Sequence, residues 1–179
     1  LASDNYPANN ILTQCFDIRT SYDPNDKAAY PAGNTDTSVK EITYTIRFQN
    51  TGNDTAFNIY IMDTLDKNVE VSSFELLSSS HKNTTQVSAS GIVRFNFANI
   101  LLPDSNVNAP LSHGYVQYKV KLKDNLALGT KVENTAYIYF DYNPPVVTNT
   151  TTNTISINMP TGTGFRNENT EARVYTKPA

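Results

Sequence analysis

The chain has 179 residues, 17% of them charged, with a formal net charge of −3 at pH 7 and an isoelectric point near 5.3. This length suits a single domain of roughly 100–200 residues with flanking segments. The acidic balance supplies no basic surface for phosphate groups, so nucleic acid is not expected among the partners. Because no apolar run approaches the ~20 residues of a membrane-spanning helix, membrane insertion is not expected either.

Residues 1–22 contain a short apolar stretch around Ile11, Leu12 and Phe16. Such a stretch suffices for one strand, so we expect either the end of a preceding domain or an extra edge strand of this one. Cys15 is the single cysteine and cannot form a disulfide within the chain. The main domain is expected at residues 23–158.

The most regular strand pattern covers residues 42–48, where apolar and polar side chains alternate. This period is typical of a strand with one buried face. The next residues, NTGND at 50–54, favour a turn, and residues 55–62 alternate again. The two runs together predict a β-hairpin.

Further strand-like runs follow at similar spacing, at residues 69–77, 91–100, 113–122, 133–142 and 146–158. No segment has a sustained helical repeat of apolar residues, so no helix longer than a turn or two is expected. The pattern predicts an all-β fold, an antiparallel β-sandwich of about seven to nine strands. The candidates for the core or its edge are Tyr44, Ile46, Phe48, Ile59, Ile61, Phe95, Phe97, Val116, Tyr118, Val120, Tyr137 and Tyr139.

Several phrases of the sequence occur together in a known family. They are SYDPNDK at 21–27, YTIRFQNTGNDTAFNIYIMDTLD at 44–66, LPDSN at 102–106, SHGYV at 112–116 and NTAYIYFDYNPP at 134–145. As a set they resemble a conserved repeat domain of large secreted and surface proteins of Bacteroidota, which often lies just upstream of a C-terminal sorting domain read by the type IX secretion system. The resemblance implies an immunoglobulin-like sandwich, export to the surface or medium, and an accessory role beside adhesive or polysaccharide-degrading domains.

Residues 159–179 mix Pro, Gly, Thr and charged side chains without periodicity, which is typical of a linker. The end, RVYTKPA at 173–179, is similar to the phrase that opens many such sorting domains, and it departs from that phrase at Thr176 and Lys177. We therefore expect a linker toward a sorting domain.

Asp and Asn recur in the predicted turns, and oxygen-rich loops of this kind suit Ca²⁺. If successive strands reverse direction, the ends of the 55–62 and 133–142 strands and the 101–112 connection fall at one pole. The candidate calcium ligands are Asp23, Asn25, Asp26, Asp63, Asp104, Asp141 and Asn143. Because the same residue types are favoured in turns without any metal, both explanations stay open.

No set of residues predicts catalysis. His81 and His113, the only histidines, lie in neither a metal-binding nor a Cys–His pattern, and the serines at 78–80 lack a Gly-x-Ser-x-Gly elbow. The chain is therefore not expected to be an enzyme. A Lys–Asn isopeptide bond between strands, such as one joining Lys40 and Asn134 with the help of an acid, is compatible with a surface sandwich, although the spacing singles out no pair.

These observations predict a non-catalytic structural or adhesion module of a larger secreted or cell-surface protein, whose first partners are neighbouring domains of the same polypeptide. The alternative is a carbohydrate- or calcium-binding accessory module of a secreted polysaccharide-degrading enzyme. Its external partner would be a polysaccharide or cell-surface glycan, because exposed tyrosines can stack on sugar rings. No cofactor other than Ca²⁺ is expected.

Overall fold

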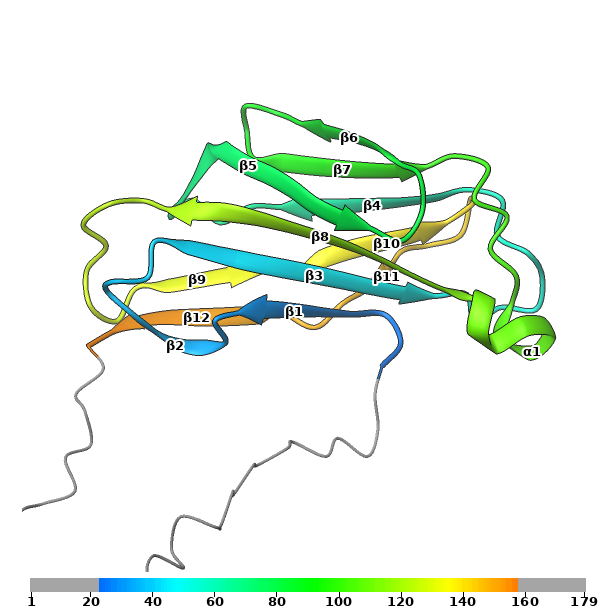
Figure 1. Cartoon of the computed structure of the whole chain (residues 1–179), viewed down its shortest axis with the longest axis horizontal. Helices are drawn as coiled ribbons and strands as arrows, with labels where there is room; N and C mark the ends of the chain where they lie inside the picture. The colour runs from blue at the N-terminus through cyan, green and yellow to red at the C-terminus, as the bar shows by residue number, and fades with distance from the viewer. Residues whose placement is uncertain (1–22, 158–179) are drawn as a thin grey trace, which may run out of the picture.

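The computed structural model describes residues 23–157, which form a β-sandwich of two layers (Figure 1). The front layer is one antiparallel sheet in the order β1-β3-β8-β5. Its strands are β1 (Asp26–Tyr30), β3 (Glu41–Gln49), β8 (His113–Leu122) and β5 (Val69–Ser79). In β3, buried side chains alternate with partly exposed ones, as the sequence pattern predicts.

The back layer consists of two sheets joined end to end. The larger has the order β11-β10-β4-β7-β6 and the smaller the order β2-β12-β9. Their strands are β11 (Val146–Val147), β10 (Ala136–Phe140), β4 (Ile59–Thr64), β7 (Ile92–Phe97), β6 (Thr84–Val87), β2 (Gly33–Asp36), β12 (Thr151–Ser156) and β9 (Lys131–Asn134). Only Thr135 separates β9 from β10, so one stretch of chain continues from the smaller sheet into the larger.

The first stretch of the described chain connects the two layers. β1 pairs with β3 in the front layer, whereas β2 pairs in parallel with β12 in the back layer. The backbone of Lys27 already lies beside the segment before β12: its N–H donates to Asn149 Oδ1 (2.9 Å), and Asn149 Nδ2 donates to the Lys27 carbonyl (2.9 Å). The Asn149 side chain thus extends the hydrogen bonding between β2 and β12 back to the start of β1.

The helical structure of the described residues is short. One α-turn, α1 (Ser105–Asn108), is followed by a 3₁₀ turn, η2 (Ala109–Leu111). Asp104 caps α1, because its Oδ1 accepts from the backbone N–H groups of Asn106 (2.9 Å) and Val107 (3.1 Å). This confirms the expected lack of long helices in the described part, where no helix has the length and apolarity that crossing a membrane requires.

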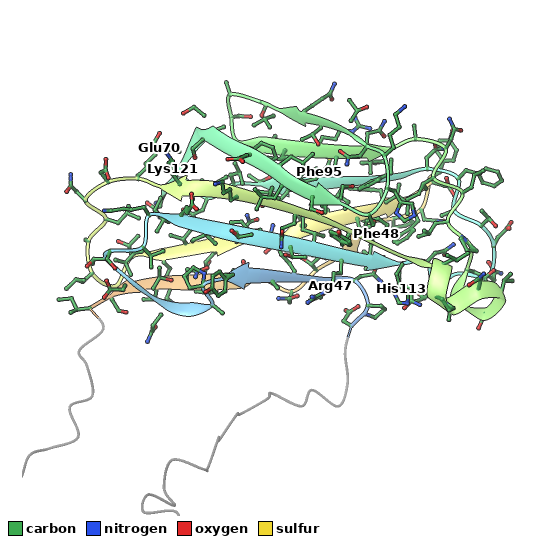
Figure 2. All side chains as sticks on the ribbon, in the orientation of Figure 1. Arg47, Phe48, Glu70, Phe95, His113 and Lys121 are labelled. Atoms are coloured by element: carbon green, nitrogen blue, oxygen red, sulfur yellow. The ribbon has the colours of Figure 1, made fainter. Side chains whose placement is uncertain are left out.

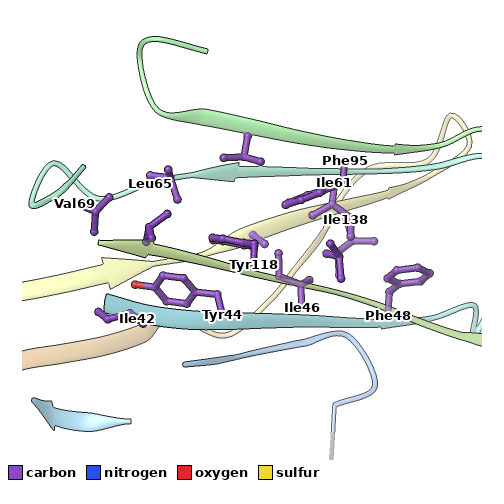
Figure 3. Packing of buried hydrophobic residues seen from close by; sticks show 14 of the residues in the cluster. Ile42, Tyr44, Ile46, Phe48, Ile61, Leu65, Val69, Phe95, Tyr118 and Ile138 are labelled. Atoms are coloured by element: carbon purple, nitrogen blue, oxygen red, sulfur yellow. The ribbon is translucent and has the colours of Figure 1, made fainter. Parts of the chain in front are cut away.

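The core lies between the two layers and contains the predicted residues of β3, β4, β7 and β8 (Figure 3). The prediction for β10 was wrong at Tyr137, which is 41% exposed, because Ala136 and Ile138 supply the buried face of this strand; Tyr139 is partly buried. The tyrosines face outward, where Tyr139 stacks on Tyr60 with ring centroids 4.3 Å apart. Outward-facing aromatic pairs of this kind stabilise a sheet from its exposed face.

The predicted hairpin between the 42–48 and 55–62 runs was also wrong. β3 pairs with β1 and β8, and β4 pairs with β10 and β7, so the two strands belong to different layers. The connecting residues are held by Asn50, which is buried and whose Nδ2 donates to the carbonyls of Asp54 (2.8 Å) and Leu102 (3.0 Å). The alternating pattern identifies the buried face of each strand but not the neighbour with which the strand pairs.

The described residues form twelve strands, more than the predicted seven to nine. The additional strands are the short elements β1, β2 and β6 and the halves of two predicted runs, which break into β9 and β10 and into β11 and β12. The runs at 1–22 and 159–179 lie outside the described residues.

Candidate functional site

A group of polar side chains lies within the apolar core. We call Lys27, Asp63, Tyr118 and Asn134 the buried polar cluster; they come from β1, β4, β8 and β9 respectively. All four residues are buried, and the side chains of Lys27 and Asp63 have no exposed surface at all. Figure 3 shows Tyr118 among the apolar side chains at the centre of the sandwich. Polar groups so deeply buried are costly unless they are paired or functional.

The strand registers position these side chains. Lys27 stands opposite Ile46 in the β1–β3 ladder, and Ile46 is fully buried. Asp63 continues the buried face of β4 that begins with Ile59 and Ile61. It pairs with Ala136 of β10, two residues beyond Asn134 along the same stretch of chain. Because side chains alternate along a strand, Asn134 and Ala136 point to the same face, toward Asp63.

The hydroxyl of Tyr118 connects the members of the buried polar cluster. It donates to Asp63 Oδ2 (2.6 Å) and accepts from Lys27 Nζ (3.1 Å) and from Asn134 Nδ2 (3.1 Å). Lys27 Nζ also forms a direct ion pair with Asp63 Oδ2. The amine, the carboxyl group and the carboxamide are therefore held around one oxygen atom.

Two aromatic rings enclose the amine. Lys27 Nζ lies 4.8 Å from the ring centroid of Tyr44 and 5.4 Å from that of Tyr118. Burial lowers the pKa of the Lys27 ammonium below its usual value, although Asp63 acts in the opposite direction. Burial also raises the pKa of the Tyr118 phenol well above its usual value, and the charge of Asp63 raises it further. Burial thus disfavours the charged form of the amine while Asp63 favours it, and both burial and Asp63 keep the phenol protonated.

Two oxygens of the buried polar cluster lack a hydrogen-bond donor within the described part of the protein: Asp63 Oδ1 and Asn134 Oδ1. Buried acceptors without a donor are rare in folded proteins and costly. Such groups often mark a reactive site. The arrangement can support acyl chemistry, because a dry pocket holds an amine nucleophile, a carboxyl group that can carry a proton, and a carboxamide carbonyl.

Sequence reasoning placed Asp63 among turn residues and missed the role of Lys27. The alternation Ile59, Ile61, Asp63 offered a signal, since it puts the carboxylate on the buried face of its strand. Tyr118 was correctly assigned to the core. Lys40, considered above as a partner of Asn134, is exposed at the start of β3, and the lysine of the cluster is Lys27.

The candidate calcium ligands do not converge at one pole. Asp63 is enclosed in the core, whereas Asp141 lies at the other end of the β4–β10 pair, where its carboxylate accepts from the N–H groups of Phe57 (3.1 Å) and Asn58 (2.7 Å). The prediction of a common pole required β4 and β10 to end on the same side of the sandwich. They are antiparallel neighbours, so they end on opposite sides. Asp104 is occupied as the cap of α1.

The remaining candidates also have partners. Asp26 forms a two-bond pair with Arg47 (2.8 and 2.7 Å), and Asn25 Oδ1 accepts from the Gln49 N–H (3.1 Å). Asp23 accepts from the Asn25 N–H (2.9 Å), and the backbone N–H of Asn143 donates to the Phe140 carbonyl (3.0 Å). In residues 23–157 no group of three or more His, Cys, Asp or Glu side chains is arranged to hold a metal ion. Calcium binding stays a prediction, which titration calorimetry after chelation tests.

The outer face of the front layer has a hollow of about 680 Å³. Its lining includes Arg47 and His113, which are labelled in Figure 2. Polar side chains of this lining hydrogen-bond to each other: Gln117 Nε2 donates to Thr45 Oγ1 (3.0 Å). His81 is separate from His113 and interacts through Nδ1 with Ser80 Oγ (2.8 Å), while burial lowers its pKa. The arrangement of both histidines is that of hydrogen-bonded or surface residues at strand ends.

Comparisons with known proteins agree with the fold. A family model described as "Domain of unknown function (DUF7619)" matches residues 23–154. The N-terminal domain of the Streptococcus gordonii adhesin Sgo0707 has a TM-score of 0.55 and 16% identity, over 75% of this chain and 33% of that chain. BcpA, the major pilin subunit of Bacillus cereus, has a TM-score of 0.52 and 13% identity, over 73% and 39%.

At these identities the likeness establishes the fold, an immunoglobulin-like β-sandwich, and the predicted fold class is confirmed. The chain spans well under half of either similar structure. No curated protein matches the sequence significantly.

Proposed function

The chain belongs to the DUF7619 family of domains of unknown function, and we propose that it is a non-catalytic structural and adhesive module of a larger extracellular or cell-surface protein. The observation that carries this proposal is the path of the chain. β1 starts in the half of the molecule that contains α1, and β12 finishes at the opposite end of the long axis (Figure 1). A module whose entry and exit points are separated along its long axis extends a polypeptide and transmits tension along it.

The strand order supports a role under tension. β2 runs parallel to β12, and the start of β1 is joined to the segment before β12 through Lys27 and Asn149. Pulling the two ends apart therefore shears these neighbouring strands along their length. Because hydrogen bonds between strands lie across the direction of shear, several of them resist together. This is the arrangement that a load-carrying surface module requires.

The comparison with an adhesin and a pilin subunit supports the same proposal. The sequence phrases listed above add a finer part to it: the parent protein is exported by the type IX system of a member of the Bacteroidota, with this module upstream of a sorting domain. Its partners are the neighbouring domains of the same polypeptide and, for an adhesive role, a ligand outside the cell.

Surface labelling tests the proposal. Antibodies raised against the purified 179-residue chain should label intact cells of the producing organism, or bind protein in the culture medium. Label that depends on permeabilising the cells would contradict an extracellular location. A strain that lacks type IX secretion should lose the external signal, which tests the finer part separately.

Adhesion is tested by competition. The purified chain, added in excess, should reduce attachment of the producing cells to their natural surface if the module itself contacts the ligand. A glycan array with the same chain tests the polysaccharide partner of the alternative. Unchanged attachment and a silent array together restrict the function to that of a spacer.

A further inference from the structure

The buried polar cluster contains all the groups of an amide-forming reaction. Lys27 provides a primary amine, Asn134 a carboxamide, and Asp63 a carboxyl group in direct contact with the amine. Lys27 Nζ and Asn134 Nδ2 each lie 3.1 Å from the same Tyr118 hydroxyl oxygen, so the two reactants are held side by side. Such fixed proximity replaces a bimolecular encounter by an intramolecular step.

The protonation pattern favours reaction. As an ion pair, Lys27 and Asp63 leave two buried oxygens without a donor, Asp63 Oδ1 and Asn134 Oδ1. Moving one proton from Lys27 Nζ to Asp63 makes the amine neutral and nucleophilic. The same transfer gives the carboxyl group an O–H, which is the type of donor that the two oxygens lack. Two uncharged partners also suit the apolar surroundings better than two charges do.

We propose that Lys27 and Asn134 become joined by an intramolecular isopeptide bond, with Asp63 as the proton-transferring group. Neutral Lys27 Nζ adds to Cγ of Asn134 and forms a new C–N bond. Asp63 donates its proton to Nδ2, the bond between Cγ and Nδ2 breaks, and ammonia leaves. Asp63 then takes one proton from Nζ, so it ends in the form in which it began. No oxidant, metal or cofactor takes part, and atoms balance because one amine and one primary amide give one secondary amide and ammonia.

The surroundings of Lys27 favour amide formation over hydrolysis, and they favour Asn134 over Asn149 as the residue that reacts with the amine. The pocket excludes water, which would otherwise compete with the amine for the carbonyl. Asn149 is also close to Lys27, but both polar ends of its side chain are occupied by the Lys27 backbone. Asn134 has a free carbonyl oxygen, and its amide nitrogen bonds to the hydroxyl that also holds the amine and the acid.

The bond would join the two layers of the sandwich. Lys27 belongs to the front sheet, whereas Asn134 ends β9, which pairs with β12 at the end of the described domain. A covalent link between them connects the first strand to the neighbour of the last. The inference goes beyond the proposed function and does not depend on it, since the bond is detected by mass and not by location or adhesion.

Mass spectrometry of the full 179-residue chain tests the bond. The folded wild-type chain should be lighter than its sequence mass by about 17 Da, the mass of ammonia. Lys27→Met, Asp63→Asn and Asn134→Ala should each have the full sequence mass. Lys40→Met is the matched control, because it removes an exposed lysine and should keep the mass deficit. Proteolysis of the wild type should release a branched peptide in which Lys27 is linked to Asn134.

A time course separates the chemistry from folding defects of the variants. Wild-type chain kept in denaturant from its synthesis should have the full mass, and the deficit should develop after refolding, because the reactive pocket exists only in the folded protein. A folded wild type that keeps its full mass would overturn the proposal. A branched peptide that joins Lys27 to a different residue would overturn the assignment of Asn134. Full retention of the bond in folded Asp63→Asn would overturn the role of Asp63.

Discussion

Lys27 Nζ and Asp63 Oδ2 form an ion pair that joins the front and back layers of the sandwich, with both side chains completely shielded from solvent. Taking two charges out of water costs several kcal/mol for each ion, and the pair stays in place only because each charge compensates the other. The stability of the fold should therefore depend strongly on keeping both partners or removing both.

This dependence is best measured in the Asn134→Ala background, where no isopeptide bond can form. Asp63→Asn should lower the free energy of unfolding by about 3–5 kcal/mol, because it leaves the Lys27 charge buried without a partner. The double replacement Lys27→Met with Asp63→Leu should restore most of this loss. Urea unfolding gives both values. Equal destabilisation by the single and double replacements would mean that the charges do not compensate each other.

Loss of the isopeptide bond should change the unfolded state as well as the folded one. A link between Lys27 and Asn134 closes a loop of about 100 residues, for which loop-closure entropy predicts a stabilisation of roughly 4–5 kcal/mol. The unfolded wild type is then more compact, so Asn134→Ala should unfold at lower urea concentration with a steeper slope. A lower midpoint with an unchanged slope would indicate only lost contacts.

The pH dependence of stability should reveal the buried phenols. Burial raises the pKa values of Tyr44 and Tyr118 above their ordinary value of 10.0, so both stay protonated in the fold when the unfolded chain has released the protons. The fold binds more protons there, and stability should fall as the pH rises above about 10. Thermal unfolding between neutral and alkaline pH measures this, with the fully exposed Tyr142 replaced by Phe as the control.

The Lys27 amine should change the pH dependence of stability in the opposite direction to the phenols. It should do so only in a chain without the isopeptide bond. In Asn134→Ala, the lowered pKa of Lys27 means that the unfolded chain binds more protons between the folded pKa and 10.5. Stability of that variant should therefore rise with pH toward about 10, before the phenols reverse the trend. The linked wild type has no free amine at this position and should lack the rise. The same rise in the wild type would contradict the link.

Gly114→Ala should destabilise the front sheet. A Cβ at this position would lie 2.2 Å from Phe48 Cζ and 2.3 Å from Cε2, which is closer than van der Waals contact allows. Because Phe48 is fully buried, its ring cannot move away freely, and a loss of about 1–3 kcal/mol or more is expected. Gly33→Ala is the comparison, since its φ of +70° gives backbone strain with no atom within 4 Å. Urea midpoints should be lower for Gly114→Ala than for Gly33→Ala.

Asp141→Ala should loosen the end of the β4–β10 pair. The Asp141 carboxylate accepts two backbone N–H groups, from Phe57 and Asn58, and its own φ is +52°. Alanine loses both hydrogen bonds and tolerates this conformation poorly, so about 1–3 kcal/mol should be lost. Asp141→Asn should cost less, because asparagine keeps an acceptor and tolerates positive φ. Thermal unfolding with and without Ca²⁺ compares these variants and tests metal binding at Asp141 together.

Much of the fold could be predicted from alternation alone. Ile42, Tyr44, Ile46 and Phe48 identify the buried face of β3 because the period of two is uninterrupted. The same rule failed at Tyr137, since aromatic residues occur on both faces of β10 and the small Ala136 gives a weak signal. Strand pairing could not be predicted, because β3 pairs with β1 and with β8, which is far along the chain, and not with β4, the next strand in the sequence.

The buried polar cluster could be predicted only in part. Asp63 occupies a position of the alternating pattern that is otherwise apolar. Asn134 lies two residues before the buried Ala136, so alternation places its side chain on the same face. Lys27 gave no such signal, because β1 is short and follows a turn-like phrase. Lys27 is buried because β1 pairs with β3 so that Lys27 lies opposite Ile46. This pairing is a tertiary property, which the local sequence does not reveal.

The members of the buried polar cluster are far apart in the sequence, on β1, β4, β8 and β9. No local segment can therefore bring amine, acid and amide together, and the pocket assembles only after β9 has joined the sandwich. In the proposed secreted protein, a translocating chain would therefore cross the membrane without the Lys27–Asn134 bond. The bond would form afterwards, where the module folds.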